Sequence, residues 1–346
     1  MRVRAPGRVN LIGEHTDYNG GLAAPMAVDR FVDVLYEPAD APTLRVRTDI
    51  DRHPVDLPLD LAWDPERLRA LEPDWARLAG AVFAAVGHRA GGALSVTSTL
   101  SVGAGLSSSA AFCVAVALAL GADPDPWSMA ELCRRAESAV GAPVGLMDPL
   151  VSVAASAGHL LRIDFAAQSY RAVPLPGDVE VAVVDSGVAR RLALTPYAER
   201  RGECERAAAR LGHPLGLADA RELATIADPT LRARARHVVG ECERVDTFLG
   251  ALGSGDLRAA GRAMVESHRS LATDFAASTA EIDALVEGLC ATDGVYGARL
   301  CGGGFGGNVV LLCRPRSLET PEWSSRAQVL AASGGARRSE LDAEPA

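Results

Sequence analysis

The hydrophobic and polar positions in the first half of the chain predict both strands and helices. Residues 43–48 and 92–100 are short runs rich in β-branched side chains and bounded by Pro or Gly, and residues 30–36 alternate as a half-buried strand does. Between them, residues 65–86 repeat with a helical period that is interrupted or restarted near Pro73. We therefore expect strands on either side of a broken helix.

A further helix in this half should lie deep in the core. Residues 107–120 are mostly Ala, Val and Leu after a glycine-rich opening, and a helix that is apolar all round is buried on nearly all sides. Residues 126–140 predict another helix, and residues 158–163 predict a strand.

The second half is predicted to be mainly helical after a buried strand at residues 179–184. One helical stripe is formed by apolar residues spaced by four, three, four and three: Val238, Cys242, Val245, Leu249 and Leu252. Helices near 255–271 and 279–290 continue this pattern, and the region closes on strands at 297–300 and 309–313.

The length of 346 residues favours two domains, because single cores stop growing near about 250 to 300 residues. The Pro-Leu-Pro-Gly segment at 174–177 separates two strand patterns and is the best candidate boundary. We expect domains at 1–174 and 178–330, and a disordered tail at 331–346, which is rich in Gly, Arg, Ser and acidic residues.

Composition and charge exclude several classes of protein. The net charge of −9 argues against nucleic acid as a partner. No apolar run approaches the ~18 residues of a membrane span, and the first residues lack the apolar core of a signal peptide. We therefore expect a cytoplasmic protein without a membrane partner. The seven scattered cysteines form no Cys-x-x-Cys pair and are expected to be buried and reduced.

The chain contains no lysine, since every basic residue other than histidine is arginine. The Walker A loop and the protein-kinase mechanism both place a lysine on the nucleotide phosphates. Any nucleotide chemistry must therefore use backbone amides, arginine and metal.

Residues 5–20 combine charged, imidazole and amide side chains with glycines, a mixture that no regular element requires. This pattern indicates a rigid loop that presents Glu14, His15, Asp17 and Asn19 to a hydroxyl-rich ligand, with Arg8 nearby for an anion. The alternative is a capped turn with solvated charges.

A second candidate site begins between a predicted strand and the apolar helix. Glycines let consecutive amides point one way, and a helix N-terminus adds a positive dipole end. The pattern suits a phosphate cradle, and one hydroxyl could ligate Mg²⁺. A plain serine cap is the alternative. The candidate phosphate-binding residues are Gly103, Ala104, Gly105, Leu106, Ser107, Ser108 and Ser109.

Two further segments have a structural and a functional interpretation. Asp148 precedes Pro149 as an N-cap residue precedes the first helical position, so a helix start is the simpler explanation. Glu137 would by default be a solvated helix residue. Residues 301–308 contain five glycines, which fits a flexible hairpin or a loop whose backbone is approached closely.

Three of these blocks, in this order, resemble the signature motifs of the kinases named for galactokinase, homoserine, mevalonate and phosphomevalonate kinases (GHMP kinases). They are residues 7–20, 103–110 and 301–307, and the first is most similar to the galactokinase branch. Shorter matches to that branch occur at 144–148, 197–204, 234–238 and 266–268. The resemblance spans about residues 3 to 313, with Pro149 and Asn308 as departures from the usual motif residues.

The resemblance implies two α/β domains of the GHMP kinase fold, the second ferredoxin-like, with the active site in the cleft between them. It implies Asp148 as general base and Arg8 as the residue that stabilises the transition state. It implies Mg²⁺ at Ser109 and Glu137, with ATP at the 103–109 loop. The implied sugar-binding residues are Glu14, His15, Thr16, Asp17, Gly145 and Tyr197.

The implied activity is ATP-dependent phosphorylation of galactose at its anomeric oxygen by a monomer. A kinase for another sugar, such as N-acetylgalactosamine or arabinose, is one alternative. A regulator that binds galactose and ATP without turnover is the other.

Overall fold

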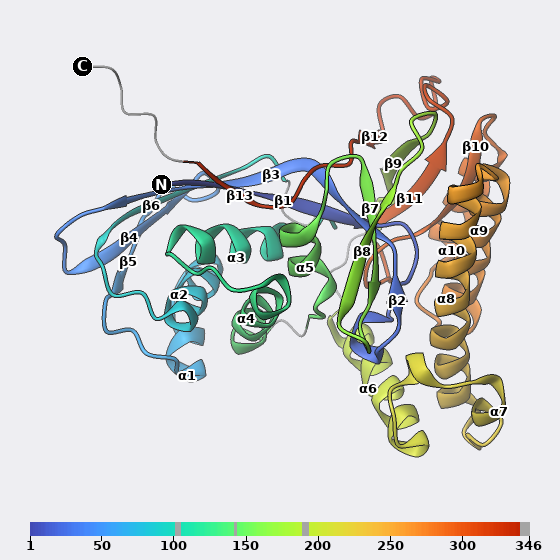
Figure 1. The fold of residues 1–346 in the computed structure, drawn as a ribbon, viewed down its shortest axis with the longest axis horizontal. Coiled ribbons are helices and arrows are strands. Elements are labelled where there is room, and N and C mark those ends of the chain that lie inside the picture. The colour runs from blue at the N-terminus through green and yellow to red at the C-terminus, as the bar shows by residue number, and fades with distance from the viewer. Residues whose placement is uncertain (101–104, 142–143, 189–193, 340–346) are drawn as a thin grey trace.

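The computed structural model describes residues 1–100, 105–141, 144–188 and 194–339. The first half of the chain forms one side of the molecule, and the helices of the second half stand on the other side (Figure 1). No helix in the described ranges is long and apolar enough to cross a membrane.

The N-terminal half is built on a six-stranded sheet. All neighbouring strands are antiparallel except β4 and β6, which are parallel. In sheet order the strands are β13 (Arg337–Ser339), β1 (Arg2–Asn10), β3 (Pro25–Pro38), β6 (Gly92–Ser98), β4 (Thr43–Thr48) and β5 (Val55–Pro58).

Helices cover one face of this sheet (Figure 1). They are α1 (Pro65–Arg69), α2 (Asp74–Val86), α3 (Ser108–Ala119), α4 (Pro126–Ala139) and α5 (Met147–Ala154). The predicted break near Pro73 separates α1 from α2. Helix α3 is buried along most of its length, as its apolar composition predicts. It begins beside β1, so the serines at its N-terminus lie close to the first motif.

A small sheet lies beside these helices. It contains β2 (Leu22–Ala23), β7 (His159–Asp164) and β8 (Ser169–Pro174). The short helix η1 (Asp17–Asn19) lies between β1 and β2, so the first motif leaves the main sheet and crosses to the small one.

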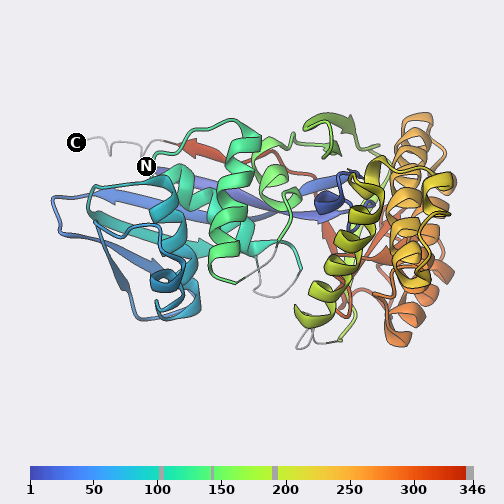
Figure 2. The same ribbon diagram turned by 90° about the horizontal axis from the view of Figure 1, so that it is seen from below.

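The C-terminal half packs helices against a four-stranded antiparallel sheet (Figures 1 and 2). In sheet order the strands are β10 (Val295–Leu300), β11 (Asn308–Cys313), β9 (Glu180–Asp185) and β12 (Ala327–Leu330). The helices are α6 (Leu194–Leu211), η2 (Leu215–Leu217), α7 (Ala220–Leu223), α8 (Pro229–Ser254), α9 (Leu257–Thr273) and α10 (Ala280–Ala291).

Helix α8 has clear start and stop signals. The Asp228 side chain accepts hydrogen bonds from the first backbone amides, Pro229 opens the helix, and Gly255 ends it at φ 76°. The predicted apolar stripe faces the core, but the same buried face also carries Arg234, His237 and Glu241. Buried polar groups need partners. Arg234 donates to the Glu203 carboxylate and to the Asp274 carbonyl, and the partners of His237 and Glu241 are described below.

The Pro6-Gly7 pair lies in a strand and not in the loop that the sequence predicts for residues 5–20. It lies inside β1, at a register shift between Pro6 and Arg8. A side chain at Gly7 would put its Cβ 2.4 Å from the Leu106 carbonyl oxygen, and the Ser152 hydroxyl donates to the Pro6 carbonyl at 2.8 Å. The bulge therefore lets the loop before α3 approach the strand closely.

The prediction of a disordered tail is wrong for residues 331–339. Strand β13 adds to the free edge of β1, and the Ser333 amide donates to the Ala27 carbonyl at 2.9 Å. Backbone pairing of this kind does not depend on apolar side chains, so a polar composition did not reveal it. Residues 340–346 lie outside the described ranges.

Candidate functional site

A cavity of about 320 Å³ lies where the first motif meets α5, α6 and the loop between β10 and β11. It is lined by Arg8, Glu14, His15, Asp17, Tyr18, Val144, Gly145, Met147, Asp148, Tyr197, Gly302, Gly303 and Gly304. These residues come from both halves of the chain, so the cavity depends on how the halves pack together.

Arg8 and Asp148 form a bidentate ion pair at the cavity wall. Nε and Nη2 of Arg8 donate to the two carboxylate oxygens, each at 2.6 Å. Burial of the guanidinium works against its charge, but the Asp148 carboxylate outweighs this effect and raises the pKa of Arg8. The side chain of Asp148 keeps 25% of its surface exposed, so the carboxylate remains accessible from the cavity.

Asp148 does not cap α5. The helix begins at Met147, and no side chain makes an N-terminal cap hydrogen bond. The Asp148-Pro149 pair therefore lies in the first turn of a helix, as the sequence predicts, but Asp148 is not its N-cap residue. The carboxylate instead accepts from Arg8 and from the Ser107 hydroxyl, which is 2.5 Å from Oδ2.

The loop before α3 is fastened to the same pair. The Arg8 backbone amide donates to the Leu106 carbonyl at 3.0 Å, and Arg8 Nη1 donates to the Gly105 carbonyl at 3.0 Å. Ser107 has φ 60°, a left-handed conformation that non-glycine residues rarely adopt. This backbone directs its hydroxyl to Asp148, so the loop that should hold phosphate also contacts the acid.

Asp17 and Gly145 meet across the cavity. A Cβ at Gly145 would lie 1.4 Å from Oδ2 of Asp17, so only glycine leaves room for this carboxylate. Burial, together with the negative charge of Asp148, raises the pKa of Asp17 to about 6. The carboxylate is ionised above that pH and can then accept hydrogen bonds from ligand hydroxyls.

His15 is held in a neutral, strained state. Its φ is 62°, and its ring stacks on Phe275 with the centroids 4.1 Å apart. Burial, with the nearby His237 and Arg299, lowers the pKa of His15 well below its usual value. Nδ1 lies 2.9 Å from the Tyr18 hydroxyl. Nε2 is buried and has no hydrogen-bond partner among the described residues.

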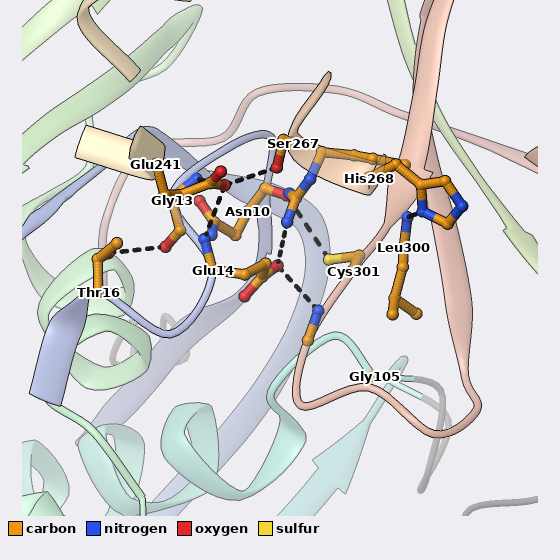
Figure 3. A network of polar contacts seen from close by, with 12 residues as sticks. Asn10, Gly13, Glu14, Thr16, Gly105, Glu241, Ser267, His268, Leu300 and Cys301 are labelled. Atoms are coloured by element: carbon orange, nitrogen blue, oxygen red, sulfur yellow. Dashed lines mark hydrogen bonds and ion pairs between the residues drawn. The ribbon is translucent and has the colours of Figure 1, made fainter. Parts of the chain in front are cut away.

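Glu14 is gripped by the second half of the chain (Figure 3). The Gly302 amide donates to its Oε1 at 2.8 Å, and Nη2 of Arg299 forms an ion pair with the same oxygen at 3.3 Å. Gly303 packs against the Tyr197 ring, since a Cβ there would lie 3.1 Å from the ring edge. The glycine loop therefore shapes this cavity, a role that its sequence left open.

Seven of the predicted catalytic and sugar-binding residues thus surround a single cavity: Arg8, Glu14, His15, Asp17, Gly145, Asp148 and Tyr197. Thr16 does not line it, which corrects the sequence-based expectation. Its hydroxyl is fully buried between the Gly13 and Leu22 carbonyls, at 2.8 and 2.7 Å. Asn19 is also structural, since its amide donates to the His15 carbonyl at 2.7 Å.

A second hollow, of about 140 Å³ and largely apolar, adjoins the start of α3. Among its lining residues are Ser108 and Ser109, with Trp75 and Phe112 as aromatic walls. Gly103 and Ala104 of the predicted phosphate loop lie outside the described residues, and Leu106 packs in the core. No sequence pattern indicates this hollow, because Trp75 and Phe112 have the spacing of ordinary core residues.

Glu137 on α4 is buried rather than solvated, with 2% of its surface exposed. Burial raises its pKa to about 7, and a hydrogen bond from Ser109 opposes that rise. Its Oε2 has no hydrogen-bond partner in the described part of the chain. A buried carboxylate and a neighbouring hydroxyl are oxygen ligands of the kind that Mg²⁺ takes, so these residues fit the predicted metal.

Comparison with family models gives matches to both halves of the chain. The model described as "Galactokinase galactose-binding signature" matches residues 1–38. The models "GHMP kinases N terminal domain" and "GHMP kinases C terminal" match residues 75–156 and 248–320.

Known proteins are similar over most of their length. A galactokinase of Chloroflexus aggregans is 40% identical over 92% of this chain and 85% of its own. A human galactokinase is 40% identical over 90% of this chain and 83% of its own. The crystal structure of Lactococcus lactis galactokinase complexed with galactose matches with a TM-score of 0.89 at 24% identity, covering 97% of this chain and 94% of its own.

Proposed function

The chain belongs to the galactokinase family of the GHMP kinases, and from this premise we propose that it transfers the terminal phosphate of ATP to the anomeric oxygen of galactose. The product would be α-D-galactose 1-phosphate, with ADP released. The observation that carries the proposal is the single cavity in which the Arg8–Asp148 pair faces Glu14, His15 and Asp17.

Asp148 is suited to act as the general base. A carboxylate oxygen has two lone pairs, so the contacts with Arg8 and Ser107 leave room for one more hydrogen bond from a sugar hydroxyl. In this proposal the anomeric hydroxyl gives its proton to Asp148 as its oxygen attacks the phosphorus. Arg8 stays charged throughout and stabilises the negative charge that develops beside it.

The sugar would be oriented by groups that cannot rotate freely. Oε1 of Glu14 is occupied by Gly302 and Arg299, and we propose that its other oxygen accepts a sugar hydroxyl. The unpartnered Nε2 of His15 and the carboxylate of Asp17 would bind further hydroxyls. Fixed polar partners of this kind select one stereochemical arrangement.

ATP would bind beside the start of α3. The amides at a helix N-terminus favour phosphate, and the apolar hollow with Trp75 and Phe112 lies next to Ser108 and Ser109. We propose that this hollow takes the adenine ring. The absence of lysine from the chain leaves these amides, Arg8 and a metal to stabilise the phosphates.

Ser109 and Glu137 are the residues that would hold Mg²⁺. When bound, the ion would neutralise phosphate charge on ATP. We expect Ser109→Ala and Glu137→Gln each to need several-fold more Mg²⁺ for half-maximal activity, because each change removes or weakens an oxygen ligand. A Mg²⁺ titration of the initial rate at saturating ATP measures this. Titration curves that coincide with the parent protein's for both variants would contradict the assignment.

We also propose that the two domains divide at residues 174–178. The GHMP N- and C-terminal family models lie on either side of this point. Strand β13 is an exception to a simple division, because the end of the chain returns to the N-terminal sheet. The described residues that line the sugar cavity come from both halves of this chain, and we propose that the protein acts as a monomer.

The proposed activity is tested by coupled ADP release with ATP, Mg²⁺ and a panel of sugars. We expect galactose to give the highest kcat/KM, with phosphorus NMR showing one α-anomeric 1-phosphate. A higher kcat/KM for N-acetylgalactosamine or arabinose would show that galactose is not the preferred substrate, while the assignment as a sugar kinase would stand. Galactose binding without ADP release from any sugar would instead indicate a ligand-binding regulator.

A further inference from the structure

Two buried side chains on α8 grip the backbone on both sides of Glu14. Oε1 of Glu241 accepts from the amides of Gly13 and Glu14, at 2.9 and 3.3 Å (Figure 3). One helical turn earlier, Nε2 of His237 lies 3.1 Å from the Glu14 carbonyl oxygen. Residues spaced by four share one face of a helix, so α8 holds this peptide segment from one side.

The partners of His237 define its tautomer. A carbonyl oxygen only accepts hydrogen bonds, so Nε2 must carry the proton that is shared with Glu14. Burial lowers the pKa of His237 to about 4, so the ring is neutral at physiological pH. Nδ1 therefore accepts a hydrogen bond from the Ser270 hydroxyl at 2.9 Å. The ring is fixed at both nitrogens.

Both carboxylate oxygens of Glu241 likewise have hydrogen-bond partners. Burial alone would raise the pKa of Glu241, but the positive charges of protonated His237, Arg244 and Arg299 and a hydrogen bond from Ser267 lower it to about 2. The Ser267 hydroxyl donates to Oε1 at 2.6 Å, and Arg244 donates to Oε2 at 2.8 Å. The carboxylate therefore accepts hydrogen bonds only, as two backbone amides require.

The segment that these residues hold has positive φ at two positions, of which only the non-glycine one is unfavourable. Gly13 has φ 99° and His15 has φ 62°, and a strained non-glycine residue persists only where its surroundings hold it. Both Glu14 and His15 line the sugar cavity. Contacts that fix the Glu14 peptide therefore also set the positions of two sugar-binding side chains.

We propose that His237 and Glu241, named here the α8 clamp, are positioning residues for sugar binding. The clamp acts through the backbone of Gly13 and Glu14 and does not touch the substrate. This inference rests on the proposed function of the cavity. It also gives a role to two segments that the sequence resemblance identified without one, residues 234–238 and 266–268, which contain His237 and Ser267.

The first test replaces Glu241 by glutamine. Both carboxylate oxygens of Glu241 accept hydrogen bonds, but a glutamine side chain has one oxygen that accepts and one NH₂ group that donates. The NH₂ group of the glutamine would therefore face donors, either on Arg244 or on Gly13 and Ser267. We expect KM for galactose to rise at least about tenfold and KM for ATP to change less than twofold. Glu243→Gln is the matched control: it makes the same charge change on the same helix at an exposed position, and both constants should stay unchanged.

The second test compares two substitutions of His237. Glutamine can place an amide N–H near the position of Nε2, whereas leucine removes the donor. We expect His237→Gln to retain a galactose KM several-fold closer to that of the parent protein than His237→Leu does. This comparison decides the proposal even if Glu241→Gln does not fold, as judged by circular dichroism and thermal unfolding.

The inference is wrong if galactose and ATP constants move together in folded Glu241→Gln, or if the two His237 variants are equally impaired. It is also wrong if KM for galactose stays within twofold in every clamp variant. If the parent protein prefers another sugar, the same comparison is made with that sugar. The sugar panel with the parent protein shows whether galactose is the wrong substrate, whereas only the variants show whether the α8 clamp positions the sugar-binding residues.

Discussion

Replacing Asp148 by asparagine is expected to lower kcat by roughly 10² to 10⁴-fold, the usual contribution of a positioned base. Asparagine has nearly the same shape, and its oxygen can still accept one bond from Arg8. It cannot take up the proton of a sugar hydroxyl. The binding of galactose and ATP should change much less than kcat, because Asp148 contributes most in the transition state.

The measurement is kcat from coupled ADP release, with galactose affinity determined by titration calorimetry. Asp125→Asn provides the control, since Asp125 caps α4 by accepting from Trp127 and Ser128 amides and asparagine caps about equally well. That variant should keep the parent rate. Near-parent turnover in folded Asp148→Asn would assign Asp148 a structural role only.

Galactose should be preferred over glucose by at least about 10²-fold in kcat/KM. The hydrogen-bond acceptors in the cavity are held in place. Gly302 and Arg299 bind the Glu14 carboxylate, and the absence of a side chain at Gly145 leaves space for the Asp17 carboxylate. Inverting one hydroxyl would remove a hydrogen bond to a charged group, worth roughly 1.5 to 3 kcal/mol, and leave a buried acceptor unpaired. Sites built on such bonds discriminate strongly.

Initial rates with both sugars at pH 7.5 test this preference, since Asp17 has a pKa of about 6 and is ionised there. Asp17→Asn should lower kcat/KM for galactose more than kcat/KM for glucose, so that the ratio between the two values becomes smaller. Comparable kcat/KM values for the two sugars, or phosphate on the primary hydroxyl, would exclude the proposed substrate while leaving a sugar kinase.

The order of apolar and polar residues within a segment was sufficient to predict helices whose burial or ends depend on their own residues. The apolar run at 107–120 became the buried helix α3, and the break at Pro73 separates two helices. The motif at the start of the chain was placed at a ligand cavity because no regular element accounts for its mixture of glycines and acids. The family resemblance alone gave roles to Arg8 and Asp148, since no local period relates residues 140 positions apart.

The remaining features depend on contacts that a local pattern does not encode. Thr16 is polar, but two backbone carbonyls use its hydroxyl. His237 and Glu241 lie beside an apolar stripe on the buried face of α8, and their role depends on what packs against that face. Polar residues on an otherwise buried helical face are the signal that could have identified them, because such residues need partners.

The hydrogen bond between the Gly302 amide and Glu14 joins residues 288 positions apart. The sugar cavity is therefore assembled only after almost the whole chain has been synthesised, and a growing chain on the ribosome does not yet contain its glycine wall. Such distant contacts form late, because the entropy of closing a long loop must be lost first. A bound sugar would accordingly favour the completely folded chain over forms in which one half has separated from the other, and galactose would protect the protein against unfolding as a single unit.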